Sequence, residues 1–279
     1  LGDFYELFFD DAELAARELE ITLTSREAGN ANRVPMCGVP YHAVDGYLAR
    51  LIAKGYRVAI CEQMEDPKLT KGIVKREVVR VVTPGTILSE SALAERGNNY
   101  LALVFEKGSE FALAAADIST GEFLWTLFSG PDRFPALLNQ LSRLLPAELV
   151  VTGKMERWSD FEKFMQVRLT GCTITTFVND ASPQWQELPA RHFAAADIPS
   201  EQAAFTAVAQ LLHYLHQTMK TDLSHVNRLT RFRLQDILMV DATTLRNLEI
   251  TRNMREGGKR GSLLGVIGLT VTAMGGRLL

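Results

Sequence analysis

The dipeptide Pro84-Gly85 constrains the fold of this 279-residue chain more than any other feature. It ends a strand-like run, EVVRVVT at 77–83, because proline fixes its φ angle and has no amide hydrogen to pair with another strand. The residues that follow, as far as Asn99, are polar and turn-rich, which is typical of a linker. Domains usually contain roughly 100 to 200 residues. We therefore expect two or three domains, with a linker at 84–99.

The segment 1–83 combines short helices and strands. The sequence DDAELAARELE at 10–20 begins with acids and is rich in helix-forming residues, and apolar residues at helical spacing over 47–52 precede Gly55, a typical C-terminal cap. The other expected elements are strands at 21–24, 57–61 and 77–83, a turn at 28–33 and an irregular loop at 35–40. This pattern predicts one compact α/β domain over 1–83.

The segment 100–228 shows a second pattern of the same class. Strand-like runs at 100–105 and 111–128, divided by turns, predict an antiparallel meander. The elements expected after it are a helix at 135–145, strands at 148–152 and 173–178, and a long helix at 200–218. We therefore predict a second α/β domain over 100–228. The segment 232–255 has apolar residues at helical spacing, so 229–279 is predicted to begin an all-helical domain.

Composition excludes several classes of protein. Thirty basic and 33 acidic residues give a net charge of -3, which by itself argues neither for nor against nucleic acid. Three distant cysteines offer no C-x-x-C pair for zinc or a redox disulfide, and no apolar run reaches the roughly 18 residues that span a membrane. The chain has no secretory leader, begins without Met and ends in apolar residues, so we interpret it as a fragment of a soluble, intracellular protein.

The tripeptide Phe4-Tyr5-Glu6 places an aromatic ring close to an acid. If the segment is extended, Phe4 and Glu6 point to one side while Tyr5 and Leu7 point to the other. Taken alone, the pattern favours core roles for Phe4, Leu7 and Phe8 and a solvated Glu6.

Four sequence blocks are more specific together than the tripeptide is alone. They are GDFYELFFDDA at 2–12, PMCGVPYHA at 35–43, AICEQMEDP at 59–67 and VVRVVTPGT at 78–86. In order and spacing they resemble the mismatch-binding domain of the MutS family of DNA mismatch repair proteins. The resemblance continues through DISTGEF at 117–123, RNLEIT at 246–251 and SLLGVIGLTVTAMGGRLL at 262–279, and it is looser over 124–230. Gly268 and Leu269 depart from the acidic and polar residues usual in that last block.

The resemblance implies that Phe4 and Glu6 bind the mismatch. A phenylalanine wedged from the minor groove unstacks a base step at a cost of a few kcal/mol, and the cost is lower where base pairing is already defective. The resemblance implies that Glu6 bonds to a ring nitrogen of the wedged base. An ionised carboxylate is repelled by nearby phosphates, so we hypothesise that Glu6 shares or gains a proton there.

Three more residues are candidates for contact with the DNA backbone or minor groove. Met36 either approaches the minor groove or fills a gap in the core. Arg76 and Arg80 lie in a basic segment, and they either contact phosphates or lie at a solvated strand edge.

The resemblance also implies a fold and partners. The segment 100–228 would be an RNase H-like α/β connector domain, and the ligand would be duplex DNA with mismatches or small loops. The parent protein would be a homodimer that works with a MutL-type partner in the bacterial cytoplasm, associated with the nucleoid and not with a membrane.

No catalysis is expected of this chain. The family binds ATP and Mg²⁺ in a C-terminal ATPase domain, and nothing here matches G-x-x-x-x-G-K-[ST]. Gly257-Gly-Lys-Arg260 lacks the first glycine, and Arg260 stands where Ser or Thr would hold magnesium. His213 and His216 are spaced to share a helix face, but no third metal ligand suggests itself, so an ordinary amphipathic helix is preferred.

The alternative function is a stand-alone RNase H-like, metal-dependent nuclease. Asp117 would then hold magnesium, but two-metal hydrolysis needs several convergent acids. Glu148, Asp160 and Asp180 show no supporting pattern. A turn-capping role is therefore preferred for Asp117, next to Ser119 and Thr120.

Overall fold

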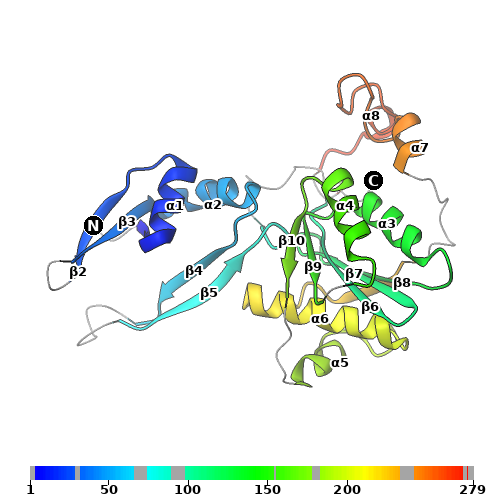
Figure 1. Cartoon of the computed structure of the whole chain (residues 1–279), viewed down its shortest axis with the longest axis horizontal. Coiled ribbons are helices and arrows are strands. Elements are labelled where there is room, and N and C mark those ends of the chain that lie inside the picture. The colour runs from blue at the N-terminus through cyan, green and yellow to red at the C-terminus, as the bar shows by residue number, and fades with distance from the viewer. Residues whose placement is uncertain are drawn as a thin grey trace. The chain divides into compact units, whose positions relative to one another are not determined.

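The computed structural model describes residues 4–28, 32–65, 74–88, 98–153, 155–177, 183–232, 242–272 and 275. The chain divides into two compact units, Leu1–Ala94 and Glu95–Leu279, and each is described by itself (Figure 1). Both combine strands with helices, as the α/β class requires. None of the helices in the described residues is both long enough and apolar enough to cross a bilayer.

Unit 1 contains a three-stranded antiparallel sheet of order β1-β3-β2, a two-stranded β4-β5 hairpin and two α-helices. Its elements are β1 (Phe4–Phe8), α1 (Phe9–Leu19), β2 (Thr24–Ala28), β3 (Asn32–Pro40), η1 (Tyr41–Ala43), α2 (Val44–Ala53), β4 (Val58–Gln63) and β5 (Arg76–Val82). One face of the sheet packs on α1, where Ala12, Ala15 and Leu19 meet Cys37 and Val39 of β3. The expected helix at 10–20 and the strands at 57–61 and 77–83 are confirmed.

The expected loop at 35–40 is wrong, because this segment lies in β3. Strand β2 pairs with β3 as far as Met36, and β1 pairs with β3 from Met36 onward. Pro35 therefore has only β2 beside it among the described strands, and Pro40 is the last residue of its strand. Proline is tolerated at such edge positions because one side of the backbone needs no ladder hydrogen bond.

The expected strand at 21–24 is also placed wrongly, since β2 begins at Thr24. Glu20 ends α1 in the left-handed conformation, with φ 57°, and the amide of Ile21 donates back to the carbonyl of Ala16 at 3.1 Å. This pattern is a helix C-terminal cap, and it folds the Ile21 side chain against the core shared with α1. The apolar residues before Thr24 therefore cap a helix.

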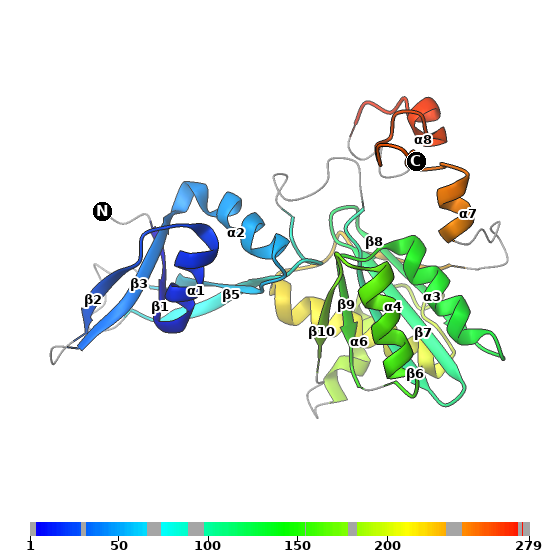
Figure 2. The same cartoon turned by 45° about the horizontal axis from the view of Figure 1, so that its top comes forward.

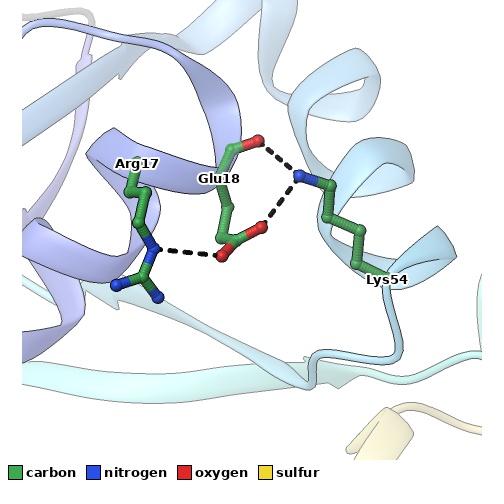
Figure 3. Close-up of polar contacts among 3 residues, drawn as sticks. All are labelled: Arg17, Glu18 and Lys54. Carbon is green, nitrogen blue, oxygen red and sulfur yellow. Dashed lines mark hydrogen bonds and ion pairs between the residues drawn. The ribbon is translucent and has the colours of Figure 1, made fainter.

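The C-terminal ends of α1 and α2 are joined by charged side chains (Figure 3). Lys54 Nζ donates to the backbone carbonyl of Glu18 at 2.9 Å and to its Oε2 at 2.8 Å, while Arg17 Nε approaches Oε1 at 3.3 Å. The hydrogen bond from Lys54 lowers the pKa of Glu18. Gly55 follows in the left-handed conformation, with φ 83°, so the cap expected there is confirmed.

The residues after β5 belong to the core of unit 1. Thr83 and Thr86 have no solvent exposure, and their Oγ1 atoms lie 2.9 Å apart. Ile87 packs with Leu48 and Val82. The segment 84–99 that we expected to be a linker therefore begins with residues that are part of a packed turn.

Unit 2 is built on a six-stranded mixed sheet of order β10-β9-β6-β7-β8-β11. Its elements are β6 (Leu101–Lys107), β7 (Glu110–Asp117), β8 (Glu122–Phe128), α3 (Arg133–Leu144), β9 (Glu148–Val151), α4 (Trp158–Arg168), β10 (Thr173–Thr176), η2 (Pro183–Glu187), α5 (Leu188–His192), α6 (Gln202–Met219), β11 (Arg228–Arg231), α7 (Ala242–Asn247) and α8 (Leu263–Ile267). Strands β6, β7 and β8 form the expected antiparallel meander. Strands β9 and β10 run parallel to β6, and β11 runs parallel to β8.

Helices cover both faces of this sheet. Alternate residues of the central strands point to opposite faces: Leu101 and Leu103 pack with α6, whereas Ala102 and Val104 pack with α3 and α4. Figures 1 and 2 both show α6 on one side of the sheet and α3 with α4 on the other. Unit 2 is therefore a three-layer α/β structure, and the long helix expected at 200–218 lies on one of its faces.

The helix expected over 232–255 does not continue beyond Asn247, so the prediction is wrong for 248–255. Residues 233–241 of the expected helix lie outside the described residues. Helix α7 ends at Asn247, and Glu249 adopts the left-handed conformation, with φ 49°. The carboxylate of Glu249 accepts the amide of Met254 at 2.7 Å. This local hydrogen bond competes with the helical one, so helical spacing of apolar residues is not sufficient here.

A buried carboxylate joins the strands of unit 2 to α6, and it provides a test of this packing. Glu148 has no solvent exposure, and it accepts hydrogen bonds from Thr175 and Tyr214, both at 2.6 Å. We expect Tyr214→Phe to lower the free energy of unfolding by about 1.5–3 kcal/mol, as for loss of a hydrogen bond to a charged group. Urea denaturation measures this change.

Tyr100→Phe is the matched control, because the Tyr100 hydroxyl also donates to a glutamate, Glu122 at 2.7 Å, but in a half-buried position. Its loss of unfolding free energy should be about half of the loss at Tyr214. Equal losses in the two variants would contradict the claim that burial makes the Glu148 cluster important.

Candidate nucleic-acid interface

The open face of the β1-β3-β2 sheet carries Phe4 and Glu6. Directly opposite residues of antiparallel strands place their side chains on the same face. Phe4 pairs with Pro40 and Glu6 pairs with Gly38, so these four positions share one face. Tyr5, between Phe4 and Glu6, packs on the other face against the core that includes α1. The expectation that Phe4 and Glu6 point to the same side is confirmed.

Phe4 projects from the open face with 64% of its surface exposed. The core role that the pattern alone favours is wrong for Phe4, because α1 covers the opposite face of the sheet. Gly38 leaves space beside the ring: a Cβ at this position would lie 3.6 Å from Cδ1 of Phe4 and 3.3 Å from the carbonyl oxygen of Tyr5. A longer side chain at position 38 would therefore press on the ring.

Arg26 of β2 is the charged partner of Glu6. Its Nη1 lies 3.4 Å from Oε2 of Glu6, and the two side chains are 64% and 40% exposed. Arg26 is opposite Val34 of β3, which places it on the open face. Exposed ion pairs contribute little to stability, so either charge is easily exchanged for a ligand. Arg26 was not expected at this face because the predicted strand at 21–24 begins three residues before β2.

Met36 lies in the middle of β3 on the same open face. Its register partners are Phe8 on one side and Thr24 on the other, and its side chain is half-buried. The core formed with α1 lies on the other face of the sheet, so Met36 does not fill a gap in that core. The structure thus brings Met36 to the surface that carries Phe4 and Glu6.

A β-bulge separates the two candidate arginines of the β4-β5 hairpin. Arg76 is opposite the exposed Gln63, whereas Arg80 is opposite the half-buried Ile60, and the register shifts just after Ile60. Without the bulge, residues four apart in a strand would face the same side. Burial lowers the pKa of the Arg80 guanidinium, and the nearby Asp45 carboxylate partly offsets that effect. Arg76 remains on the exposed face.

Tyr5 connects the open sheet to two other elements. Its hydroxyl donates to Oε1 of Glu62 in β4. Its ring stacks on Tyr41 of η1, with centroids 5.5 Å apart and planes inclined by 22°. Burial, and then the bond to Glu62, raise the pKa of Tyr5 far above its ordinary value, so the hydroxyl stays protonated and donates at neutral pH. Strands β1 and β4 therefore meet at this residue.

A cavity of about 920 Å³ adjoins the candidate residues. Its lining combines residues of β1, β2, η1, α2 and β4, among them Phe4, Glu6, Arg26, Tyr41 and Glu62. It therefore extends from the open face of the sheet to the Tyr5 contact, and it offers both aromatic surface and charged groups to a ligand.

Asp117 of unit 2 acts as a turn cap. Its Oδ1 accepts the amide and hydroxyl of Ser119, at 2.9 and 2.7 Å, and its Oδ2 accepts the amide of Asn99 at 3.1 Å. Gly121 closes the turn with φ 76°, so close to the backbone of His225 that a Cβ would lie 2.6 Å from its carbonyl oxygen. Both Asp117 oxygens are therefore committed to protein donors.

The other acids considered for a nuclease do not converge on Asp117. Glu148 is bonded to Thr175 and Tyr214, and Asp160 forms an ion pair with Arg157 at 2.5 Å. Asp180 lies outside the described residues. Within the described part of the chain, no group of three or more His, Cys, Asp or Glu residues is arranged to hold a metal ion. The nuclease alternative therefore has no support.

The two histidines of α6 have aromatic and amide neighbours. The ring of His216 lies 5.9 Å from that of His192, and His213 contacts Gln217 at 2.9 Å. Burial lowers the pKa of His216, with smaller contributions from His192 and His213. The interpretation of α6 as an ordinary amphipathic helix agrees with its packing against the sheet.

The segment around Gly257-Gly-Lys-Arg260 does not fit a phosphate-binding loop. The backbone turns between Asn253 and Ser262, where Ser262 caps the short helix α8 by accepting the amide of Gly265 at 3.1 Å. A P-loop requires a strand before the glycines and a helix directly after Lys-Ser/Thr, and the described residues supply neither. We therefore derive no nucleotide chemistry from this segment.

Unit 1 presents an aromatic ring, a carboxylate and an arginine on one open sheet face, and unit 2 is a three-layer α/β structure. These features define a modular α/β protein with a candidate recognition surface on unit 1. Models of the MutS family match almost all of the chain: MutS domain I matches residues 1–91, MutS domain II residues 99–227 and MutS domain III residues 243–279. The chain therefore belongs to the MutS family.

Curated relatives match the whole chain. It is 46% identical over 284 residues to the DNA mismatch repair protein MutS of Ruminiclostridium cellulolyticum, and 48% identical over 291 residues to that of Pelotomaculum thermopropionicum. The Desulforamulus reducens relative of the same name is 46% identical over 286 residues. The matches cover 100% of this chain and 32% or 33% of each relative, so the chain spans about a third of their length.

Proposed function

We propose that unit 1 recognises mismatched or looped base pairs in duplex DNA, with Phe4 as the wedge and Glu6 as the group that hydrogen-bonds the displaced base. The observation that carries this proposal is the exposed Phe4 ring beside Glu6 on an open sheet face. Membership of the MutS family, and relatives named for DNA mismatch repair, support it.

The arrangement explains how discrimination works without a contact for every base. The free energy needed to open a base step with an aromatic wedge is lower where base pairing is already defective, so the deformability of DNA selects the site. Glu6 then shares or gains a proton and hydrogen-bonds to a ring nitrogen of the displaced base. Arg26 balances the Glu6 charge before binding and is free to turn to a phosphate afterwards.

Unit 2 is proposed to be the RNase H-like connector of a longer protein. The support is its sheet, in which an antiparallel three-stranded meander is followed by two strands parallel to the first. We propose domains over 1–83, 100–228 and 229–279, with 84–99 between the first two. For the whole protein we propose an ATP- and Mg²⁺-dependent homodimeric clamp that binds a MutL-type partner in the bacterial cytoplasm, associated with the nucleoid.

The wedge is tested by comparing two equally exposed phenylalanines of unit 1. Phe4 and Phe9 are 64% and 63% exposed, but Phe9 lies beyond β1, at the start of α1. Phe4→Ala should reduce the affinity for a single-mismatch duplex by about 10- to 100-fold, equivalent to about 1.4–2.8 kcal/mol, and should reduce affinity for the matched duplex much less. Phe9→Ala should change neither the mismatch affinity nor the matched-duplex affinity by more than about twofold.

Titrations are made at fixed salt, because affinity for DNA depends steeply on salt. They use the 279-residue chain and, in parallel, the Ruminiclostridium cellulolyticum relative with its matching segment replaced by this chain. Equal losses on both duplexes after Phe4→Ala would identify Phe4 as a general contact. No mismatch preference in either wild-type protein would reject the proposed function.

The protonation of Glu6 is tested with Glu6→Gln. An amide donates a hydrogen bond without needing a proton from solvent, so this variant should bind the mismatch at neutral pH at least as tightly as wild type. Wild-type affinity for the mismatch should rise as the pH falls, and the variant should lose that dependence. Weaker binding by Glu6→Gln, together with pH-independent wild-type binding, would reject the protonation hypothesis.

Arg76 and Arg80 are both proposed as phosphate contacts, with Arg76 the better placed on the exposed face of the hairpin. Arg76→Ala should weaken binding to matched and mismatched duplexes equally and should reduce the slope of log affinity against log salt by about 1. Arg80→Ala, measured beside it, should change the slope less and thermal stability more, since Arg80 is half-buried. An unchanged slope for Arg76→Ala would show that Arg76 does not contact a phosphate.

Met36 is proposed to approach the minor groove beside the wedge. Its place on the open face, between Phe8 and Thr24 in register, supports this proposal. A thioether on an unbranched chain adapts to irregular apolar surfaces, which suits contact with a distorted base step.

A further inference from the structure

We propose that Tyr5 is a positioning residue for mismatch recognition, and that its contacts with Glu62 and Tyr41 hold the end of β1 in the orientation that aims Phe4 outward. This inference rests on the proposed function of Phe4 and Glu6. It assigns a role to Tyr5, Glu62 and Tyr41, which the proposed function leaves without one.

Strand β1 needs such an anchor because of its position in the sheet. It has five residues and is an edge strand in the order β1-β3-β2. Phe4 is the first residue of β1 and is opposite Pro40, the last residue of β3. The described β1–β3 ladder therefore ends at the pair from which the proposed wedge projects, and a force on the Phe4 ring acts on the end of an edge strand.

Tyr5 is the first residue after Phe4 that points toward the interior. Its hydroxyl donates to the carboxylate of Glu62, fifty-seven positions away in β4. Hydrogen bonds to an ionised acceptor are roughly twice as strong as those between neutral groups. This bond joins the end of β1 to a second pair of strands that is itself held by the β4-β5 ladder.

The ring of Tyr5 is fixed from another direction by Tyr41. The two rings are 5.5 Å apart and nearly parallel, although Tyr41 remains 60% exposed. Tyr41 directly follows Pro40, the register partner of Phe4. The stack therefore supports the same strand end at which the described β1–β3 ladder stops.

Charges around Glu62 favour its role as acceptor. Glu77 lies opposite Glu62 on β5, and Lys75 forms an ion pair with Glu77 at 2.6 Å. The cation reduces the repulsion between the two neighbouring carboxylates. Glu62 therefore accepts the Tyr5 hydroxyl beside a carboxylate whose own charge is paired with Lys75.

The test is a double-mutant cycle between Tyr5 and Phe4. Tyr5→Phe removes the hydroxyl and keeps the stacked ring, so the variant should fold. It should reduce the ratio of mismatched to matched affinity by about 3- to 10-fold, with matched affinity unchanged. In a Phe4→Ala background the same substitution should have no further effect on the ratio, because Tyr5 acts through Phe4.

Tyr56→Phe is the matched control. The Tyr56 side chain also hydrogen-bonds to a glutamate of unit 1, Glu18, but this glutamate joins α1 to the end of α2 through Lys54. It should leave the affinity ratio unchanged even if it lowers stability as much as Tyr5→Phe does. Glu62→Gln retains an acceptor oxygen and should preserve more of the ratio than Glu62→Ala.

All variants are measured in the form of the protein that shows the wild-type mismatch preference, and urea denaturation records their stability. A normal ratio for Tyr5→Phe, or an equal loss of ratio for Tyr56→Phe at matched stability, overturns the inference while the wedge itself stands. An effect of Tyr5→Phe that persists in the Phe4→Ala background also overturns it. A wild type without mismatch preference instead overturns the proposed function.

Discussion

The hydrogen-bond register of β1 on β3 is the constraint on which the candidate site depends. Side chains alternate across a strand, so a slip of one residue would bury Phe4 and Glu6 and expose Tyr5. The register is held from the covered side, where Tyr5 packs with Cys37 and Val39 against α1. Gly38 then leaves open the space beside the Phe4 ring. The β1–β3 pairing thus packs Tyr5 against the core and exposes Phe4, the proposed wedge.

Much of unit 1 follows from local pattern, and its failures have identifiable physical causes. Helix α1 and strands β4 and β5 were predictable because their periodicity is regular. Strand β3 was not predictable, because Pro35 and Pro40 are typical of a loop. Each proline fits in β3 because at most one described strand pairs with it, and that pairing is not visible in the sequence. The bulge after Ile60 and the Glu6–Arg26 pair depend on pairing between distant segments, which spacing along the sequence does not encode.

Unit 2 shows how a buried acid misleads a search for chemistry. Asp117 and Glu148 are both fully buried, which in an enzyme often indicates a tuned catalytic group. Here their oxygens accept hydrogen bonds from neighbouring amides and hydroxyls, and these bonds close a turn and join strands to α6. The sequence supported the turn cap at Asp117 because Ser119 and Thr120 follow it. It gave no sign of the link from Glu148 to Tyr214, sixty-six positions away.

A carboxylate on a proposed DNA-binding surface is useful because it is unfavourable near intact duplex. Glu6 would be repelled by the phosphates of any DNA, so its presence lowers affinity for well-paired sequence as well as for the target. A mismatched base that the proposed wedge has displaced offers Glu6 a hydrogen-bonding edge. The hydrogen bond offsets the repulsion between Glu6 and the phosphates, and it forms only at the mismatch. Specificity is a difference between two affinities, and weakening the unwanted complex increases it as effectively as strengthening the wanted one. The nearby Arg26 limits the cost in the free protein, since the exposed pair holds Glu6 only loosely.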